Sequence, residues 1–232
     1  MEENIVIITG MSKAFPTGEG EFLALKNINL HFGKGEFAGI VGPSGSGKTT
    51  LLNVIGSLDT PTSGEVEVLG QKVSQLSQKG SSELRSRHLG FIFQTYNLLP
   101  VYNVYENVEF PLLLLRMDAE RRNKAVLDAL EWVGLTDKIK SRPSQLSGGQ
   151  CQRVAIARAM VKKPTLVLAD EPTANLDTEN SLHILDTMRN INSRLGTSFI
   201  FATHDQKVIN YMRRVIKLID GEVKGDATQT GT

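Results

Sequence analysis

The chain has 232 residues, of which 40% are hydrophobic and 22% charged, and its net charge is +1. This composition predicts one or two globular domains with a core large enough to fold without disulfides or metals. The near-neutral net charge gives no indication of an electrostatic drive toward nucleic acid or an anionic membrane surface. A lone cysteine, Cys151, excludes an internal disulfide framework and predicts a reducing compartment.

The first residues, Met1-Glu2-Glu3-Asn4, are acidic, and the apolar run after them stops at Thr9, which is unlike a signal peptide. The longest purely apolar stretches, such as Leu112 to Leu115, are too short to span a bilayer. We therefore expect any membrane role to come through a partner protein.

Strand-like segments alternate with helical patterns along most of the chain. Strands are predicted at Ile5–Ile8, Leu23–Leu30, Glu36–Val41, Glu65–Leu69, Leu89–Phe93, Thr165–Ala169, Ser198–Ala202 and Arg214–Ile219. Helices are predicted at Lys48–Ser57, Asp118–Trp132, Gly149–Val161 and Thr178–Arg194. Several strands are continuous apolar runs, which is typical of parallel strands buried on both faces, so the alternation predicts an α/β fold.

The middle of the chain, from about Gln94 to Lys163, has mostly helical patterns and no clear strand. We predict a single domain with an α/β core at 1–93 and 164–223 and an inserted helical subdomain at 94–163. The last residues, 224–232, are small and polar and are expected to form a flexible tail.

A complete phosphate-binding motif, G-x-x-x-x-G-K-[ST], follows the apolar strand that ends at Val41 and precedes an apolar helix. Its glycines let backbone N–H groups surround a phosphate at a helix N-terminus. Lys48 would bridge the β- and γ-phosphates of ATP, and the Thr49 hydroxyl would bind Mg²⁺. The predicted nucleotide contacts are Gly42, Pro43, Ser44, Gly45, Ser46, Gly47, Lys48, Thr49 and Thr50.

Two carboxylates, Asp170 and Glu171, end a later apolar strand. In phosphate-loop NTPases an acid at this position of a neighbouring strand holds Mg²⁺, and Asp170 fits that role. Glu171 lies one residue beyond the strand, where it is the candidate general base for the attacking water.

A second glycine-rich helix start is Leu146-Ser147-Gly148-Gly149-Gln150, in which Ser147 is a candidate N-cap. Its backbone N–H groups form a second candidate anion site. One γ-phosphate rarely needs two such sites from one chain, so a second copy of the chain is expected to supply this one. The predicted contacts here are Ser147, Gly148, Gly149 and Gln150.

This set of motifs resembles the ATP-binding subunit of ABC transporters, whose signature LSGGQ matches Leu146–Gln150. The motif order is also similar, and the resemblance covers the chain from about Ile5 to Val223. It implies a P-loop ATPase core with an inserted helical subdomain and an N-terminal antiparallel β subdomain. It further implies MgATP hydrolysis, with ATP between two identical subunits that bind membrane subunits at the cytoplasmic face of the membrane.

The resemblance also implies roles for four single residues. Gln94 matches the glutamine that senses Mg²⁺ or water, and His204 matches the histidine that contacts the γ-phosphate. Asp177 belongs to a segment similar to the loop that crosses the dimer interface. Phe15 matches the aromatic residue that stacks on adenine, a contact worth on the order of 1 kcal/mol.

Three segments resemble the branch of the family that contains the lipoprotein-releasing (LolD) and macrolide-export (MacB) ATPase modules. They are Thr17–Leu25, Ile55–Gly64 and Gly90–Pro100. The resemblance implies membrane subunits that transmit mechanical motion to extract or expel a substrate. Cell-division ATPases of the FtsE type and the ATPases of amino-acid importers share much of this sequence and stay open as alternatives.

The segment between Gln94 and Val108 is rich in apolar and aromatic residues and is the predicted docking surface for a membrane subunit. Other classes of function are less compatible with the sequence. ABC-type ATPases that act on DNA carry a long insertion between Lys48 and Ser147, which this chain lacks. A P-loop kinase would need an acceptor-binding segment, and none is evident. A regulator that uses ATP binding as a switch would share every residue of the ATP site, so it stays open as an alternative.

Overall fold

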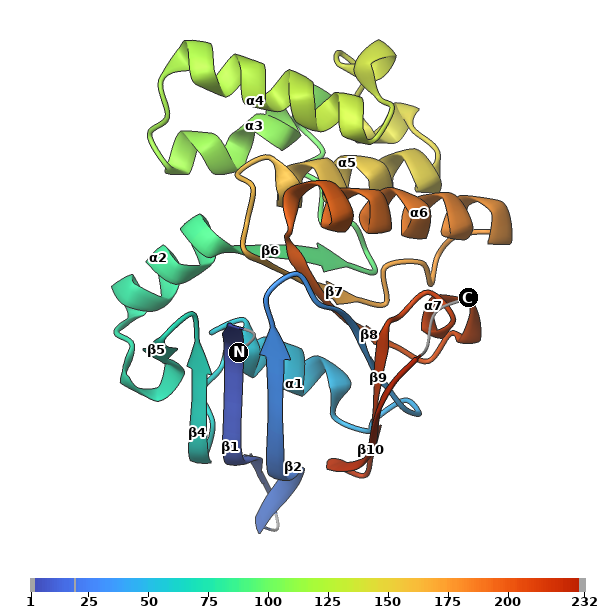
Figure 1. Ribbon diagram of the computed structural model, residues 1–232. Coiled ribbons are helices and arrows are strands. Elements are labelled where there is room, and N and C mark those ends of the chain that lie inside the picture. Colours follow the sequence, from blue (N-terminus) through green and yellow to red (C-terminus); the bar gives the residue numbers. More distant parts are fainter. Residues whose placement is uncertain (1–2, 19, 230–232) are drawn as a thin grey trace. The chain divides into compact units, whose positions relative to one another are not determined.

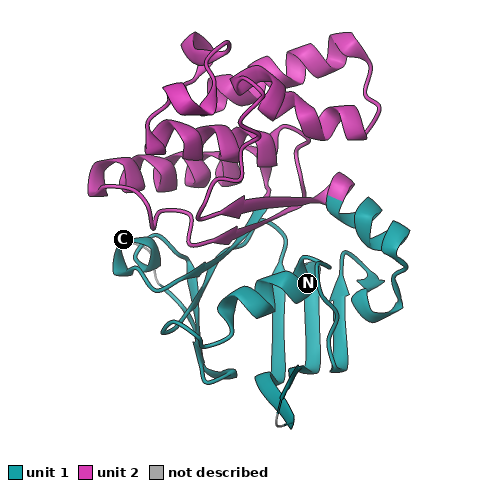
Figure 2. Ribbon diagram, turned by 180° about the vertical axis from the view of Figure 1, so that it is seen from behind, with its two compact units in different colours: residues 1–85, 198–232 teal, residues 86–197 magenta. Residues whose placement is uncertain are grey.

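The computed structural model describes residues 3–18 and 20–229. Met1 and Glu2 of the acidic N-terminus, and residues 230–232 of the predicted tail, lie outside the described residues. The chain forms two compact units, one of residues 1–85 and 198–232 and the other of residues 86–197 (Figure 2).

The first unit contains a four-stranded antiparallel sheet in the order β2-β1-β4-β5. Buried and exposed residues alternate from Ile28 to Phe32, because one face of this sheet packs on the core. The sheet confirms the expected N-terminal antiparallel β subdomain (Figure 1). Its strands are β1 (Asn4–Thr17), β2 (Gly20–Gly33), β4 (Ser63–Val68) and β5 (Gln71–Lys72).

The same unit contains four further strands in the order β10-β9-β3-β8. The parallel strands β3 and β8 are buried along their whole length, which explains their continuous apolar sequences. These strands are β3 (Phe37–Val41), β8 (Ser198–Thr203), β9 (Arg214–Ile219) and β10 (Glu222–Thr228). The helices are α1 (Lys48–Ile55), α7 (Gln206–Ile209), a 3-10 turn at Val73–Gln75, and α2 (Gln78–His88), which reaches the second unit.

The prediction of a flexible tail from residue 224 is wrong as far as Thr228, because this segment forms most of β10, antiparallel to β9. Arg214 donates hydrogen bonds of 2.7 and 2.6 Å to the two carboxylate oxygens of Asp226. It also donates one of 2.8 Å to Glu36. The guanidinium holds the pKa of Asp226 below its usual value. Backbone pairing and this bidentate ion pair therefore order a polar segment that hydrophobic burial would not.

The second unit has two parallel strands, β6 (Leu89–Phe93) and β7 (Leu166–Asp170). Its helix α5 contacts α3, α4, α6 and β6, and it runs beside α6 in both ribbon views (Figures 1 and 2). Between residues 94 and 163 the structure contains helices and no strand. The helices of this unit are α3 (Val104–Leu114), α4 (Ala119–Trp132), α5 (Gly148–Met160), α6 (Thr178–Leu195) and the 3-10 turns Thr136–Lys138 and Pro143–Gln145.

The boundaries of the second unit, residues 86–197, differ from those of the predicted helical insertion, residues 94–163. The unit is larger because β6, β7 and α6 belong to it together with the helices of the insertion. The division into core and helical subdomain therefore stays a prediction. None of the helices in the part of the chain that the structure describes is long and apolar enough to cross a membrane.

Candidate nucleotide-binding site

The phosphate-binding motif forms the loop between β3 and α1 in the first unit. Gly47 is the N-cap of α1 with a left-handed φ of 101°, and no side chain caps the helix. The first turn of α1, which includes Thr49 and Thr50, contains no acidic residue. This helix start therefore has no side-chain cap that an anion would have to displace, and the helix dipole favours negative charge there.

Glycine is required at Gly42 because the loop passes close to another strand. A Cβ atom there would lie 2.0 Å from the carbonyl oxygen of Leu218. It would also lie 2.8 Å from the Ser46 hydroxyl, which is buried and has no hydrogen-bond partner among the described residues. An open helix end with a buried unpaired hydroxyl is the chemistry that a phosphate oxygen needs, so the loop fits the phosphates of a nucleotide.

Lys48 is buried, with 7% of its surface exposed. Its Nζ donates hydrogen bonds of 2.8 Å to the Gly42 carbonyl and 2.9 Å to the Pro43 carbonyl. The ammonium group therefore lies over the loop itself, where it adds positive charge to the open end of α1.

Two other predicted residues lie in the first unit. Val41 of β3 pairs with Thr203 of β8 in parallel, so Gly42 and His204 leave the sheet at the same edge. Phe15 on β1 is 38% exposed and lies opposite Phe22 of β2. The Lys13 ammonium is 5.0 Å from the centre of the Phe15 ring, a cation–π distance.

The predicted catalytic carboxylates lie in the second unit. Phe93 of β6 pairs with Asp170 of β7 in parallel, which brings Gln94 and Glu171 to one edge of this strand pair. Glu171 has a left-handed φ of 45°, an uncommon conformation for a residue with a side chain and frequent at functional positions. The Asn175 amide donates a 2.9 Å hydrogen bond to the Gln94 carbonyl.

Helix α5 begins at the predicted second anion site. Its N-cap is Ser147, whose Oγ accepts a 3.3 Å hydrogen bond from the Gln150 backbone N–H. The Gln150 side chain accepts a 2.9 Å bond from the Ser147 N–H, which completes a capping box. A Cβ at Gly148 would lie 3.0 Å from the Tyr96 hydroxyl, and one at Gly149 would lie 2.6 Å from Asn180 Oδ1. Both glycines therefore allow close packing.

The contact with Asn180 brings the start of α5 to Asp177, the N-cap of α6. Asp177 accepts hydrogen bonds of 2.8 Å from the Asn180 backbone N–H and 2.6 Å from its side-chain amide. The bond from the Asn180 backbone is the main cause that lowers the pKa of Asp177, and the bond from the Asn180 side chain lowers it further. Cys151, the residue after Gln150, is buried. Burial raises the pKa of its side chain, which favours the uncharged thiol over the reactive thiolate.

One residue that the sequence analysis missed is Gln152, a fully buried side chain on α5. Its Nε2 donates a 2.6 Å hydrogen bond to the carbonyl of Pro172, the residue after Glu171. A polar residue on the otherwise apolar buried face of α5 was the available signal. The predicted residues thus form two groups, one in each unit: Phe15, the Gly42–Thr50 loop and His204, and Gln94, Ser147–Gln150, Asp170, Glu171 and Asp177.

Comparison with known proteins identifies the family and the fold. Residues 25–174 match the family model of ABC transporters. The chain is 42% identical to the lipoprotein-releasing system ATP-binding protein LolD of Pseudoalteromonas translucida, over 96% of each chain. It is 39% identical to LolD of Bacteroides thetaiotaomicron, over 96% of this chain and 100% of that one. The dimeric cassette MJ0796 bound to ADP and Pi has a TM-score of 0.89 at 41% identity, over 98% of this chain and 100% of that one.

Proposed function

The chain belongs to the ABC transporter family and is an ATP-binding, ATP-hydrolysing subunit, and from that premise we propose how its residues act and with what it assembles. Two copies would bind two ATP molecules head to tail. Each ATP would contact the phosphate loop of one copy and Ser147 and Gly149 of the other. The observation that carries this proposal is the pair of glycine-rich helix starts, at α1 and at α5, in a single chain.

Mg²⁺ bound with ATP would be held by Thr49, Gln94 and Asp170, and it would supply positive charge to the phosphate oxygens. Lys48 and the N–H groups at the start of α1 orient the β- and γ-phosphates. Glu171 accepts a proton from the water that attacks the γ-phosphorus, and His204 contacts the γ-phosphate. The bond between the β–γ bridging oxygen and the γ-phosphorus breaks, which yields ADP and phosphate.

The role of Glu171 is tested by Glu171→Gln, which keeps the shape of the side chain and removes the base. Hydrolysis should fall by about 10²–10⁴-fold while ATP binding persists. The stalled protein should therefore sediment as a dimer with ATP and as a monomer without it. Near-normal turnover would contradict the assignment of the base, and a mass that ignores ATP would contradict the sandwich dimer.

We propose membrane subunits of the mechanotransmission type as partners, as in lipoprotein release or macrolide export, with the ATPase held at the cytoplasmic face of the membrane. The LolD relatives support this branch. The alternatives are an FtsE-like cell-division regulator and the ATPase of an amino-acid importer. Co-purification distinguishes them, because each requires a different membrane subunit.

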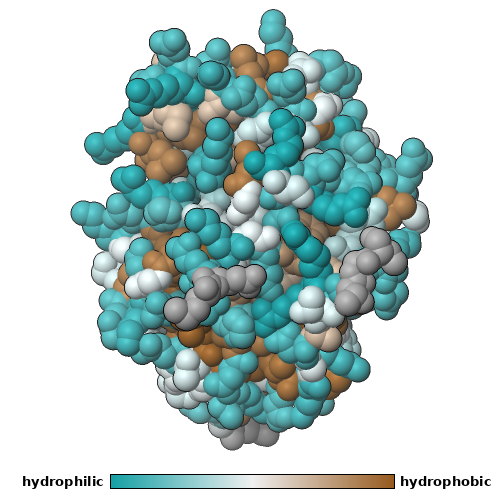
Figure 3. Space-filling view, viewed as in Figure 1, coloured by the Kyte–Doolittle hydropathy of each residue, from teal (hydrophilic) through white to brown (hydrophobic). Residues whose placement is uncertain are grey.

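The proposed docking surface between Gln94 and Val108 is partly packed. Tyr102 lies 6.3 Å from the ring of Phe110, and the Tyr105 hydroxyl donates a 3.0 Å bond to Asn123. Val101 is 73% exposed. Hydrophobic surface is also visible near the turn between α3 and α4 (Figure 3). Leu113 and Leu114, at the end of α3, are exposed.

Val101→Glu is therefore a cleaner test of the docking surface than a change at Tyr102. We expect basal ATPase activity to stay unchanged, because Val101 is exposed and is not among the residues assigned to ATP. Co-purification with the membrane subunit, and stimulation by it, should be lost because a charge would be buried. Leu127→Glu on α4 is the control, since Leu127 is exposed outside the segment. Equal coupling in both variants would place the docking surface elsewhere.

A further inference from the structure

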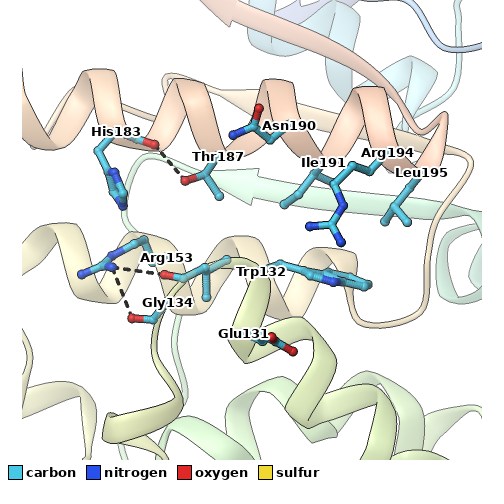
Figure 4. Close-up of a pocket in the computed structure, with 11 residues that line it drawn as sticks. Glu131, Trp132, Gly134, Arg153, His183, Thr187, Asn190, Ile191, Arg194 and Leu195 are labelled. Atoms are coloured by element: carbon cyan, nitrogen blue, oxygen red, sulfur yellow. Dashed lines mark hydrogen bonds between the residues drawn. The ribbon is translucent and has the colours of Figure 1, made fainter.

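A pocket of about 380 Å³ lies within the second unit, apart from every residue assigned to ATP. It is lined by the end of α4 and the two residues after it, by Arg153 of α5, and by α6 from His183 to Leu195 (Figure 4). Its size falls in the range of small-molecule sites, roughly 300–1,000 Å³.

Three basic side chains and one carboxylate, that of Glu131, line the pocket; the basic ones are Arg153, His183 and Arg194. Arg153 donates from Nη1 to the Val133 carbonyl at 3.1 Å and to the Gly134 carbonyl at 3.5 Å, which fixes the guanidinium. Its Nε and Nη2 groups take no part in these bonds, so donors remain for another acceptor. The pocket is therefore pre-formed for negative charge.

Figure 4 shows how the basic groups are arranged along α6. His183 points toward Arg153 at one end, and Arg194 extends toward the Trp132 ring at the other. No hydrogen bond or ion pair engages the Arg194 side chain among residues 3–18 and 20–229. An arginine beside a hollow, without a carboxylate partner, offers a planar fork to a carboxylate or phosphate.

The rest of the lining combines four apolar side chains, Trp132, Val133, Ile191 and Leu195, with Gly134 and the polar side chains of Thr187 and Asn190. Trp132 is half-buried, and Ile191 is 4% exposed. Thr187 donates its hydroxyl to the His183 carbonyl at 2.8 Å, so its hydroxyl already has an acceptor. An indole face beside Ile191 favours a flat ring, through stacking and removal of apolar surface from water.

We propose that this pocket binds a small anion that carries a planar aromatic ring, with its carboxylate or phosphate held by Arg194 and its ring against Trp132. Arg153 lies on α5, the helix that begins at Ser147, and the remaining basic groups lie on α6, the helix that begins at Asp177. A ligand held by Arg194 and Trp132 would join α6, whose N-cap is Asp177, to the end of α4. The site is separate from the phosphate loop and independent of the proposed partners.

The experiment uses Trp132, which is the single tryptophan of the chain. Its indole N–H gives one cross-peak in a ¹H–¹⁵N spectrum of the full-length protein. The probes are 1-naphthoate and 1-naphthyl phosphate, with uncharged 1-naphthalenemethanol as the matched neutral compound. We expect at least one of the two anions to shift the indole peak saturably. The neutral compound should bind at least about tenfold more weakly, because it lacks the charge-assisted bonds.

Arg194→Leu should weaken binding of the anion by about tenfold or more and leave basal ATPase activity unchanged. Arg189→Leu is its control, because Arg189 is on the same helix, pairs with Asp186 and does not line the pocket. Lys48→Met should keep the shift, which separates this pocket from the phosphate loop. The proposal is overturned if neither anion shifts the peak, if the neutral compound binds equally well, or if Arg194→Leu has no more effect than Arg189→Leu.

Discussion

Helices α1 and α5 both begin with glycine-rich turns, but their N-termini differ in whether a side chain caps them. Helix α1 starts after Gly47 without any side-chain cap, and the Lys48 ammonium lies over the loop before it. Helix α5 starts after Ser147 with a complete capping box, in which Ser147 and Gln150 satisfy each other. One helix end is open to an anion, whereas the other has already satisfied part of its own hydrogen-bonding capacity.

The difference explains why the two starts would act at different stages. A phosphate at α1 meets a helix start without a side-chain cap, so binding there displaces no capping hydrogen bond. A phosphate at α5 competes with the Ser147 hydroxyl for the Gln150 N–H, so this end offers a weaker site on its own. We therefore expect the start of α1 to bind ATP in a single chain, and the start of α5 to contribute to binding only when a second copy adds further contacts.

Removing the Lys48 ammonium changes the uncapped start of α1, and of the three variants it should have the largest effect on ATP hydrolysis. In Lys48→Met the γ-phosphate loses a charged donor in a buried setting, so ATP hydrolysis should fall by about 10²–10³-fold. Steady-state phosphate release measures this loss. Lys34→Met is the control, because Lys34 is an exposed lysine of the same unit. Turnover within a few-fold of the unchanged protein would mean that the open helix end alone holds the phosphates.

Ser147→Ala tests the capped end and should have a moderate effect. Loss of the N-cap should lower the free energy of unfolding by about 1 kcal/mol. If Ser147 also contacts the ATP of the second copy, hydrolysis should fall further than stability alone explains, while binding of ATP to the monomer stays unchanged. Asp118→Ala, which removes the N-cap of α4, is the matched control. Equal ATPase activity in the two variants would restrict Ser147 to a structural role.

The sequence predicted the parts of both helix starts that depend on neighbouring residues. Continuous apolar runs identified β3, β7 and β8, because strands buried on both faces have no polar alternation. The phosphate-binding motif that ends in Gly47-Lys48-Thr49 identified the loop before α1. Helix α3 was not assigned its own boundaries, although Asn103 and Glu106 form a capping box whose spacing was visible in the sequence. Pro111 inside the helix works against that assignment.

The rest depends on contacts between residues far apart in the chain. Nothing local to Gly149 indicates that Asn180 would leave no room for a side chain. The hydrogen bond from Gln152 to Pro172 spans 20 residues, and the pairing that orders β10 joins Arg214 to Asp226 across a turn. These features require the folded backbone, so sequence patterns could at most mark the residues as unusual.

Asp177→Asn tests how the capped start of α5 is supported by α6, and its effect should be the smallest. Asparagine can still accept a hydrogen bond from the Asn180 N–H and is a good N-cap. Its NH₂ group cannot accept the second bond, from the Asn180 side-chain amide, so the charge and this one hydrogen bond are lost. The pKa of Asp177 is lowered in the folded protein, so its charge contributes stability above the pKa of the unfolded chain, about 3.9. That contribution disappears as the pH falls through the lower, folded pKa.

The melting temperature of Asp177→Asn should therefore lie slightly below that of the unchanged protein at pH 7, and the gap should close below about pH 4. Glu179→Gln removes an equal charge from the first turn of α6 but leaves both hydrogen bonds of Asp177 in place, so it should show a smaller gap. If both variants show the same gap, the dipole of α6 accounts for it, and the bonds between Asp177 and Asn180 do not stabilise the start of α5.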